Sequence, residues 1–425
     1  MLSSWRAGGC RMAMALTFSL GPGLAHAATT SPDSIPFVSG PLTFERALTL
    51  AGQYQLSLQA ADLRAAAAQA RIRDAARAPN PTLAGAEENF GGGLGSERLE
   101  TTIELAQTLE LGGDRGARAA VATGEYRLAT AEAAVLRREA LILTAERYIA
   151  AWSLQVRLAR LREGEDLTKQ AILAAAQRHR AGASPLLERT RAESQALSQA
   201  VDRQRTEAEL VIARRELALS WGDGRASFDS LVADPITAEP DLGSRLTSHP
   251  ELERASASEA LGLARMRAAR ASRVPDVTVS GGVRHLQEAR STGFVAAVEF
   301  PLPIWTRGGG NISATRQEHE ATLADTRAIA QRLEIELSNA VERLRSATAA
   351  YDTLRLRVRP ARQELLVELL RAYRAGRLNY LDLIAEQRNL LDTDLALVDA
   401  QADLWRSRVR LEFLTGSNSR PEGGR

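Results

Sequence analysis

The sequence predicts a mainly α-helical protein with a small β part, in which one structural unit occurs twice. Three observations support this fold class. Separate motifs recur in the same order about 194 positions later. Long stretches carry the seven-residue apolar spacing of coiled coils, and short runs of alternating apolar and polar residues lie near glycine clusters. A two-copy chain of this kind favours the wall of a ring or tube over a globule around one pocket.

Three landmarks define the internal repeat. The pairs are Arg178–Gly182 with Ala372–Gly376, Arg77–Leu83 with Arg273–Val279, and Leu219–Gly222 with Phe413–Gly416. The shifts are 194, 196 and 194 positions, so the two copies share their order of elements. We therefore expect a first repeat over residues 28–230 and a second over residues 231–425. Residues 222–243, which are rich in Asp, Gly, Pro and Ser, join them.

The N-terminus has the three parts of a secretory signal. Arg6 and Arg11 supply positive charge, Met12–Leu20 is a short apolar stretch, and Ala25-His26-Ala27 is a cleavage signature. We therefore expect residues 1–27 to be removed on export.

Composition excludes several classes of function. Cys10, the single cysteine, leaves with the signal, so neither a disulfide framework nor thiol chemistry is predicted. The 54 Lys and Arg residues, less Arg6 and Arg11, equal the 52 Asp and Glu residues, which gives no basic excess for nucleic acid. No mature segment has the ~18 uninterrupted apolar residues of a membrane-spanning helix. An exported chain of this kind is soluble in the periplasm, secreted, or a β-barrel membrane protein.

Each copy predicts a helix, a strand pair, a very long helix, a tight break and a further helix. The expected helices cover residues 43–77, 115–180 and 186–220, and then 244–273, 308–375 and 379–415. Thr43 is the expected N-cap of the first helix, and Pro360 should kink the second long helix. A helix of ~66 residues spans roughly 100 Å, which two shorter helices placed end to end would match.

Apolar residues at heptad spacing predict that the long helices pack as coiled coils. In the first copy this series is Leu128, Val135, Ile142, Ile149 and Val156. In the second copy Leu333, Ala340, Ala347 and Leu354 alternate with Leu337, Leu344, Tyr351 and Val358.

Alternating runs predict one strand pair per copy, at about residues 80–110 and 275–303. Each run has about ten residues, the length of a tilted strand that spans an outer membrane. Glu104 and Glu299 face the inside of such a barrel in only one of the two possible registers. Four strands cannot close a barrel, which takes about eight, so both the strand edges and the amphipathic helices need neighbouring protomers. The residues alone therefore predict a ring of several protomers.

The junctions between the strand pairs and the long helices carry a resemblance to a known family. The first is Leu109-Glu110-Leu111-Gly112-Gly113-Asp114-Arg115-Gly116-Ala117-Arg118, and the second is Phe300-Pro301-Leu302-Pro303-Ile304-Trp305-Thr306-Arg307-Gly308-Gly309-Gly310-Asn311-Ile312. Together with Asn80-Pro81 and His249-Pro250-Glu251-Leu252, they resemble the TolC-type outer-membrane efflux family, and more narrowly its heavy-metal cation efflux branch. The resemblance covers essentially the whole mature chain.

The resemblance implies an exit duct of a tripartite efflux pump that exports metal cations or toxic compounds from a Gram-negative bacterium. It implies a homotrimer, with a twelve-stranded β-barrel in outer-membrane lipid and a twelve-helix α-barrel in the periplasm. The implied partners are a periplasmic adaptor, also called a membrane-fusion protein, and an inner-membrane pump of the resistance–nodulation–division type.

The resemblance also assigns roles to the two helix breaks, which in the family meet the adaptor and form the closed entrance. The positions that match adaptor contacts are Gly182, Pro185, Gly376 and Asn379. The positions that match the gate are Glu188, Tyr373, Arg377 and Asp382. In that gate Tyr373 and Arg377 bond Glu188 of the neighbouring hairpin, and Asp382 forms a ring with its symmetry mates that attracts cations.

The expected gate departs from the family pattern at two positions. Ala385 stands where the family can carry a second aspartate, and Leu378 stands where it carries the gate arginine, with Arg377 one residue away. A Gly-Pro break with a nearby carboxylate is also accounted for by an ordinary turn and helix cap.

No metal site, cofactor or catalytic site is predicted. The mature histidines are scattered without ligand spacing, which is typical of ordinary surface residues: His179, His249, His285 and His319. Met266 is the only mature methionine, so no thioether track for copper exists. The glycine runs Gly91–Gly93 and Gly308–Gly310 lack the Lys-Ser/Thr of a phosphate loop. We therefore do not expect an enzyme.

Two other functions stay open at this point. A multidrug or organic-solute duct of the same fold would differ only in its cargo, which the pump partner selects. A periplasmic coiled-coil adaptor or scaffold belongs to another class. Adaptors carry one helical hairpin between β-rich halves, whereas this chain predicts two hairpins and little other β-structure.

Overall fold

The computed structural model describes residues 38–416, apart from 90–98, 183–185, 234–245, 247–248, 306–307, 376 and 379. The expected signal, residues 1–27, and the glycine loop 91–95 lie outside the described residues. The chain divides into Met1–Pro36 and a second unit, Phe37–Arg425, to which all that follows refers. This unit is mainly helical with a small strand part, as the sequence predicts.

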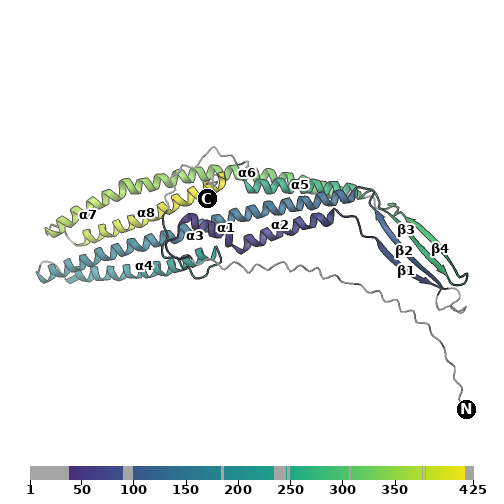
Figure 1. Cartoon of the computed structure of the whole chain (residues 1–425). Coiled ribbons are helices and arrows are strands. Elements are labelled where there is room, and N and C mark those ends of the chain that lie inside the picture. The colour runs from purple at the N-terminus through teal and green to yellow at the C-terminus, as the bar shows by residue number, and fades with distance from the viewer. Residues whose placement is uncertain are drawn as a thin grey trace, which may run out of the picture. The chain divides into compact units, whose positions relative to one another are not determined.

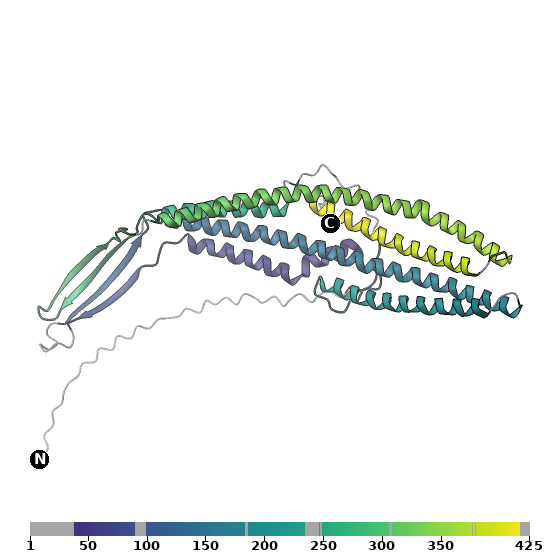
Figure 2. The same ribbon diagram turned by 180° about the vertical axis from the view of Figure 1, so that it is seen from behind.

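The order of elements is helices, two strands and helices in each half of the chain (Figure 1). The first half holds α1 (Phe44–Tyr54), α2 (Leu56–Ala75), β1 (Thr82–Glu88), β2 (Glu100–Leu109), α3 (Asp114–Arg180) and α4 (Leu186–Leu219). The second half holds α5 (Pro250–Ala271), β3 (Val277–Leu286), β4 (Ser291–Glu299), α6 (Gly309–Thr353), the π-helical turn η3 (Leu354–Val358), α7 (Arg359–Arg374) and α8 (Tyr380–Thr415). The strands lie at one end of the helices, and the α3–α4 and α7–α8 turns lie at the other (Figure 2).

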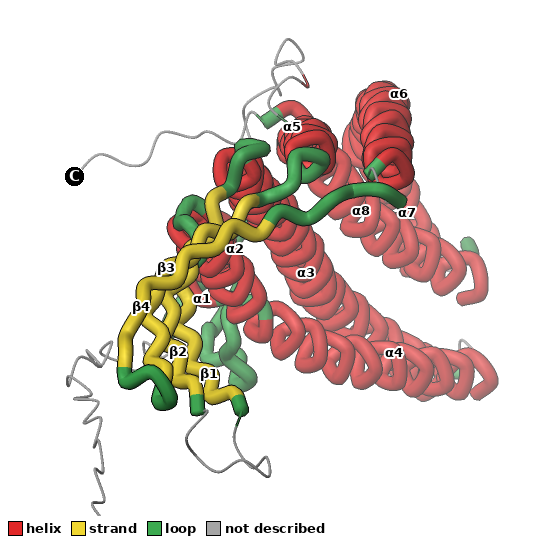
Figure 3. Tube along the Cα trace, turned by 90° about the vertical axis from the view of Figure 1, so that its right-hand side faces the viewer, coloured by secondary structure: helices red, strands yellow, loops and turns green. Residues whose placement is uncertain are grey.

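The four strands form one antiparallel sheet in the order β1-β2-β3-β4 (Figure 3). Its central pair joins the two halves of the chain, because β2 pairs with β3 from Glu100 opposite Leu286 to Leu109 opposite Val277. The register is therefore fixed across all four strands, and it decides which side chains share a face.

A left-handed glycine starts each of the helices that follow the sheet. Gly113 (φ 78°) is the N-cap of α3, and Gly308 (φ 68°) is the N-cap of α6. Only glycine adopts this backbone region without strain. The glycines that the two junction motifs share thus make the turn from strand to helix.

Two of the expected helices are interrupted. The helix expected over 43–77 begins at its Thr43 cap, whose Oγ1 accepts from Arg46 N at 3.3 Å, but the chain is extended at Gln55 and divides it into α1 and α2. Gln55 is not a helix breaker, so packing rather than propensity sets this break. The helix expected over 308–375 is interrupted by η3, and Pro360 lies in the first turn of α7. A π-helical turn relieves the clash that proline makes with the preceding turn.

The largest buried cluster lies where α1, α3, α4 and α8 meet. Its aromatic centre is Phe44, Tyr148, Trp152 and Trp405, with ring centroids 5.3–5.8 Å apart. Edge-to-face and tilted pairs at this spacing are favourable beyond the area that they bury. These four aromatic residues thus form a packed centre at the level where α1, α3 and α8 meet.

Candidate functional site

The turns α3–α4 and α7–α8 are held together by one buried cluster, which we call the tip cluster. It contains Ala171 of α3 and Ala192 of α4, and from the other hairpin Leu366, Tyr373, Tyr380, Leu383 and Leu390. The rings of Tyr373 and Tyr380 lie 5.9 Å apart between centroids. Residues almost 200 positions apart in the sequence therefore form one packed unit.

Tyr373 is the residue at which both hairpins meet. Its side chain is 3% exposed, and its hydroxyl donates to Glu188 Oε2 of α4 at 3.5 Å, the long end for a hydrogen bond. Arg178 of α3 donates from Nη1 to the Tyr373 carbonyl at 2.8 Å. The Arg178 guanidinium carbon also lies 4.4 Å from the centre of the Tyr373 ring. α3 and α4 thus each contact the same residue at the end of α7.

Burial keeps both phenols of the tip cluster neutral. It raises the pKa of Tyr373, with the Glu188 carboxylate adding to the effect and Arg178 opposing it. It raises the pKa of Tyr380 to about 12, with Tyr373 and Glu188 contributing less. The Tyr380 hydroxyl is buried without a hydrogen-bond partner among the described residues. Since Tyr373 stays protonated at any physiological pH, its hydroxyl remains a donor to Glu188.

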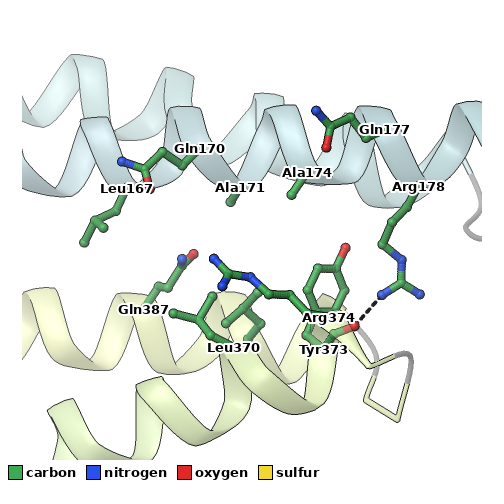
Figure 4. Close-up of a pocket in the computed structure, with 11 residues that line it drawn as sticks. Leu167, Gln170, Ala171, Ala174, Gln177, Arg178, Leu370, Tyr373, Arg374 and Gln387 are labelled. Carbon is green, nitrogen blue, oxygen red and sulfur yellow. Dashed lines mark hydrogen bonds between the residues drawn. The ribbon is translucent and has the colours of Figure 1, made fainter.

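A cleft of about 380 Å³ opens beside Tyr373, between α3 and the second hairpin. Figure 4 shows Leu167, Ala171 and Ala174 of α3 facing Leu370 and Gln387 across it. Arg178 and Arg374 lie at its Tyr373 end. The cleft therefore combines an apolar floor with amide and guanidinium groups.

Two partly buried ion pairs join α7 to α8 behind the tip. Arg362 Nη1 donates to both carboxylate oxygens of Glu386, at 3.1 and 3.3 Å, and Asn389 donates to the same carboxylate at 3.2 Å. Arg359 Nε donates to Asp394 at 2.5 Å. These bonds fix the lengthwise register of the second hairpin, and with it the position of Tyr373.

The structure places the sequence-predicted tip residues as follows. Gly182 ends the α3 turn with φ 70°, and Asp382 lies exposed in the first turn of α8. Arg377 is exposed in the second turn, where its backbone N–H donates to Ala372 O at 3.0 Å, and it makes no bond to Glu188 among the described residues. Pro185, Gly376 and Asn379 lie outside the described residues. Of the four expected gate residues, the structure thus brings Tyr373 and Glu188 together.

The sheet at the opposite end has one mainly apolar and one mainly polar face. The apolar face carries Leu83, Ile103, Leu105, Val279, Val283, Phe294 and Val298, which the register places on the same side. Phe294 is 96% exposed. The polar face carries Glu100, Thr102, Glu104, Ser280, Arg284 and Glu299. Glu104 and Glu299, whose register the sequence left open, therefore share the polar face.

The histidines and carboxylates of the described residues can be compared with the arrangement that a metal ion needs. No group of three or more His, Cys, Asp or Glu residues there is arranged to hold a metal ion. The expectation of surface histidines is wrong for His249, which is 3% exposed and caps α5 by accepting from Glu251 N at 3.2 Å. Within the same described ranges, no helix is both long and apolar enough to cross a membrane.

Comparison with known proteins agrees with this architecture. The sequence profile of the family described as "Outer membrane efflux protein" matches residues 242–417. The cobalt-zinc-cadmium resistance protein CzcC of Cupriavidus metallidurans is 28% identical over 389 residues, which is 89% of this chain and 91% of that protein. The nickel and cobalt resistance protein CnrC of the same organism is 26% identical over 82% of this chain and 76% of its own length.

The second half of the chain thus matches the outer membrane efflux protein family. Solved structures show the same fold. The channel protein CusC superimposes with a TM-score of 0.74 at 17% identity, over 88% of this chain and 91% of CusC. A membrane protein from Pseudomonas aeruginosa does so with a TM-score of 0.77 at 20% identity, over 88% and 92% of the two chains.

Similarity to outer membrane efflux proteins confirms the predicted location. The protein lies in the outer membrane of a Gram-negative bacterium, with its helical part in the periplasm. Members of the family are channels, which points away from catalysis.

Sequence reasoning missed the contact of Arg178 and the Arg362–Glu386 pair. Arg178 was visible only as part of the repeated tip motif, and its partner lies 195 positions away. Glu386 is 6% exposed, and an available signal was that it falls in the apolar series of α8, three residues after Leu383 and four before Leu390. A charge on the apolar stripe of a helix indicates a buried ion pair.

Proposed function

We propose that this outer membrane efflux protein is the exit duct of a tripartite pump, a passive conduit from the cell to the exterior. The match to the family over residues 242–417 carries the proposal, and the two faces of the sheet support it. The apolar face exposes large side chains such as Phe294 and Val298, which suits contact with lipid. The polar face carries carboxylates and hydroxyls, which suit a water-filled lumen.

The assembly that we propose is a homotrimer, in which each protomer contributes two copies of one structural unit. Four strands leave β1 and β4 as edges and are too few to close a barrel, which takes about eight. Three protomers would supply twelve strands to a transmembrane β-barrel, and their long helices would form a periplasmic α-barrel. The exposed apolar residues on the helices, such as Leu173 and Leu197, would then pack against neighbouring protomers.

The proposed cargo is metal cations. The relatives CzcC and CnrC are described as cobalt-zinc-cadmium and as nickel and cobalt resistance proteins, and both match more than three quarters of this chain. The proposed partners are a periplasmic adaptor and an inner-membrane pump of the resistance–nodulation–division type. No tight metal site is required, because a conduit must release what enters it.

The tips are proposed to form the closed entrance and to meet the adaptor. Tyr373 and Glu188 would form the gate bond, with Arg377 and Asp382 at the constriction. Gly182, Pro185, Gly376 and Asn379 would contact the adaptor. The supporting observation is that one buried tyrosine ties the second hairpin to α4.

Conductance tests the duct. Purified protein in planar lipid bilayers should give stepwise single-channel currents, and a protein that forms no pore under any condition would rule the duct out. Cell fractionation adds an independent measurement. A protein recovered only in the soluble periplasmic fraction would instead favour the adaptor or scaffold function.

A deletion strain tests the cargo. Loss of this chain should increase sensitivity to cobalt, zinc, cadmium or nickel salts more than to a panel of organic antibiotics and dyes, and expression from a plasmid should restore growth. The reverse pattern would assign an organic-solute duct of the same fold.

A further inference from the structure

Arg178 reaches from the first hairpin to the end of α7 and contacts two different parts of Tyr373. Its Nη1 donates to the Tyr373 carbonyl at 2.8 Å, and its guanidinium carbon lies 4.4 Å from the ring centroid. Figure 4 shows the guanidinium beside the end of α7, with the ring on the cleft side. Backbone and side chain of one residue are thus held by a single cation.

The carbonyl that Arg178 binds belongs to the last turn of α7, which ends at Arg374. The last four carbonyls of a helix lack the usual intrahelical partner and carry the negative end of its dipole. A guanidinium there acts as a cap supplied by another helix. The ring contact adds a cation–π interaction, and the planar guanidinium can make both contacts at once.

We infer that Arg178 is the positioning residue of the tip: it caps α7 from the first hairpin and holds the Tyr373 ring so that the hydroxyl faces Glu188. This inference rests on the gate proposed above. Arg178 itself belongs to α3 and Glu188 to α4, so Tyr373 is gripped between two members of the first hairpin. Release of the guanidinium frees both the end of α7 and the ring.

The clamp is built on one side only. In the repeat, Arg178 corresponds to Ala372 and Arg180 corresponds to Arg374. Arg374 lines the same cleft as Arg178, yet it makes no bond to Tyr373 or Glu188 among the described residues. The chain therefore offers a control that removes the same charge from the same cleft.

Bilayer recordings of full-length trimers test the inference. Arg178→Gln should raise the open fraction of the channel roughly tenfold, the effect of losing one charge-assisted hydrogen bond. Arg178→Lys keeps the charge and one donor but not the planar stacking, so it should give a smaller increase. Arg374→Gln should stay within about twofold of the parent, in contrast to the tenfold effect expected of the charged bond.

A double-mutant cycle with Tyr373→Phe separates positioning from a general loss of packing. If Arg178 acts through the hydroxyl of Tyr373, then Arg178→Gln should raise the open fraction by a clearly smaller factor in the Tyr373→Phe background than in the parent. Effects that multiply independently would overturn the inference. The inference would also be overturned if Tyr373→Phe raises the open fraction and Arg178→Gln leaves it unchanged. In that case the proposed gate bond of Tyr373 would still stand. If neither substitution changes an otherwise active pore, both the gate and this inference fail, but the duct stands.

A distance measurement keeps the inference testable even if the conductance of a variant is too low to record. The mature chain has no cysteine once Cys10 leaves with the signal, so spin labels on Ala181→Cys and Ala375→Cys report on the two turns alone. Arg178→Gln should lengthen or broaden this distance distribution, and Arg374→Gln should not. Identical distance distributions in the two variants would overturn the inference that Arg178 positions Tyr373.

Discussion

Glu386 of α8 accepts both hydrogen bonds of Arg362 Nη1 of α7 while its side chain is almost fully removed from solvent. A carboxylate in that position is favourable only while its partner is present, because an unpaired buried charge is costly.

Glu386→Ala should therefore lower the free energy of opening of the second hairpin by about 3 kcal/mol. This is the lower end of the range for breaking a buried ion pair, and it is chosen because Arg362 is partly exposed. Hydrogen exchange of the α7 and α8 amides would measure the loss as faster exchange. Glu368→Ala is the matched control, since its pair with Arg371 is about two-thirds exposed on both sides. It should cost less than about 1 kcal/mol. Equal effects of the two changes would contradict this account.

Gly282 of β3 allows the two halves of the sheet to approach. A Cβ on Gly282 would lie 2.2 Å from the Ile103 carbonyl oxygen and 2.9 Å from Glu104 Cα on β2, both backbone atoms. Gly282→Ala should cost about 1–3 kcal/mol or shift the β2–β3 pairing, and it should lower the amount of assembled protein in the outer membrane. Gly293→Ala, where an added Cβ meets nothing within 4 Å, should assemble normally. Normal assembly of both variants would show that the sheet yields at this point.

The hydroxyl of Tyr148 bonds to backbone groups of two segments that are far apart in the sequence. It lies 2.7 Å from Leu42 O and 2.8 Å from Val232 O, and it accepts from Val232 N at 3.1 Å. Tyr148→Phe should lower the free energy of unfolding by about 1 kcal/mol, because the Leu42 and Val232 carbonyls lose the hydroxyl donor that lies between them. The melting temperature in detergent would measure this. Tyr126→Phe should leave it unchanged, because the Tyr126 hydroxyl makes no bond among the described residues.

His249 predicts a dependence of stability on pH. Burial, with Arg138 adding to it, lowers the pKa of His249 to about 4, whereas an unfolded histidine has a pKa of about 6.5. Because the pKa of His249 is lower in the folded protein, the contribution of its neutral form to the free energy of unfolding is complete above about pH 6.5. This contribution is lost as the pH falls towards 4. The full loss is about 3 kcal/mol.

The variant His249→Asn keeps a side-chain acceptor for the α5 cap but cannot titrate. Its melting temperature should fall less than that of the parent between pH 7 and pH 4.5. Replacement of the exposed His285 by Asn is the control and should leave the pH dependence of the parent unchanged. Parallel pH curves for the parent and His249→Asn would argue against His249 as the titrating group.

The sequence predicted the helices well where a period could be read. Val135, Ile149, Leu333 and Ala340, all taken from the heptad series, are buried, because seven residues return a side chain to nearly the same face of a helix. The glycines at 113 and 308 likewise marked the strand-to-helix turns, since few other residues adopt their backbone conformation.

The remaining features depended on partners that no local pattern reveals. The break at Gln55 has no breaker residue, and it is set by the packing of α1 into the aromatic cluster. The faces of Glu104 and Glu299 depend on the pairing of β2 with β3, which are almost 180 positions apart. Arg178 looks like any arginine near a helix end until α7 is placed beside it.

The π-helical turn η3 sets the rotation, about the helix axis, of the residues of α7 that follow it. It adds about one residue to a turn of the helix. If Leu354–Val358 were regular α-helix, every side chain beyond them would be rotated by roughly 100° about the helix axis. Tyr373 would then point away from α3, and Arg178 could not contact its ring. The direction in which Tyr373 points from the helix axis is thus set by five residues that lie about four turns away from it.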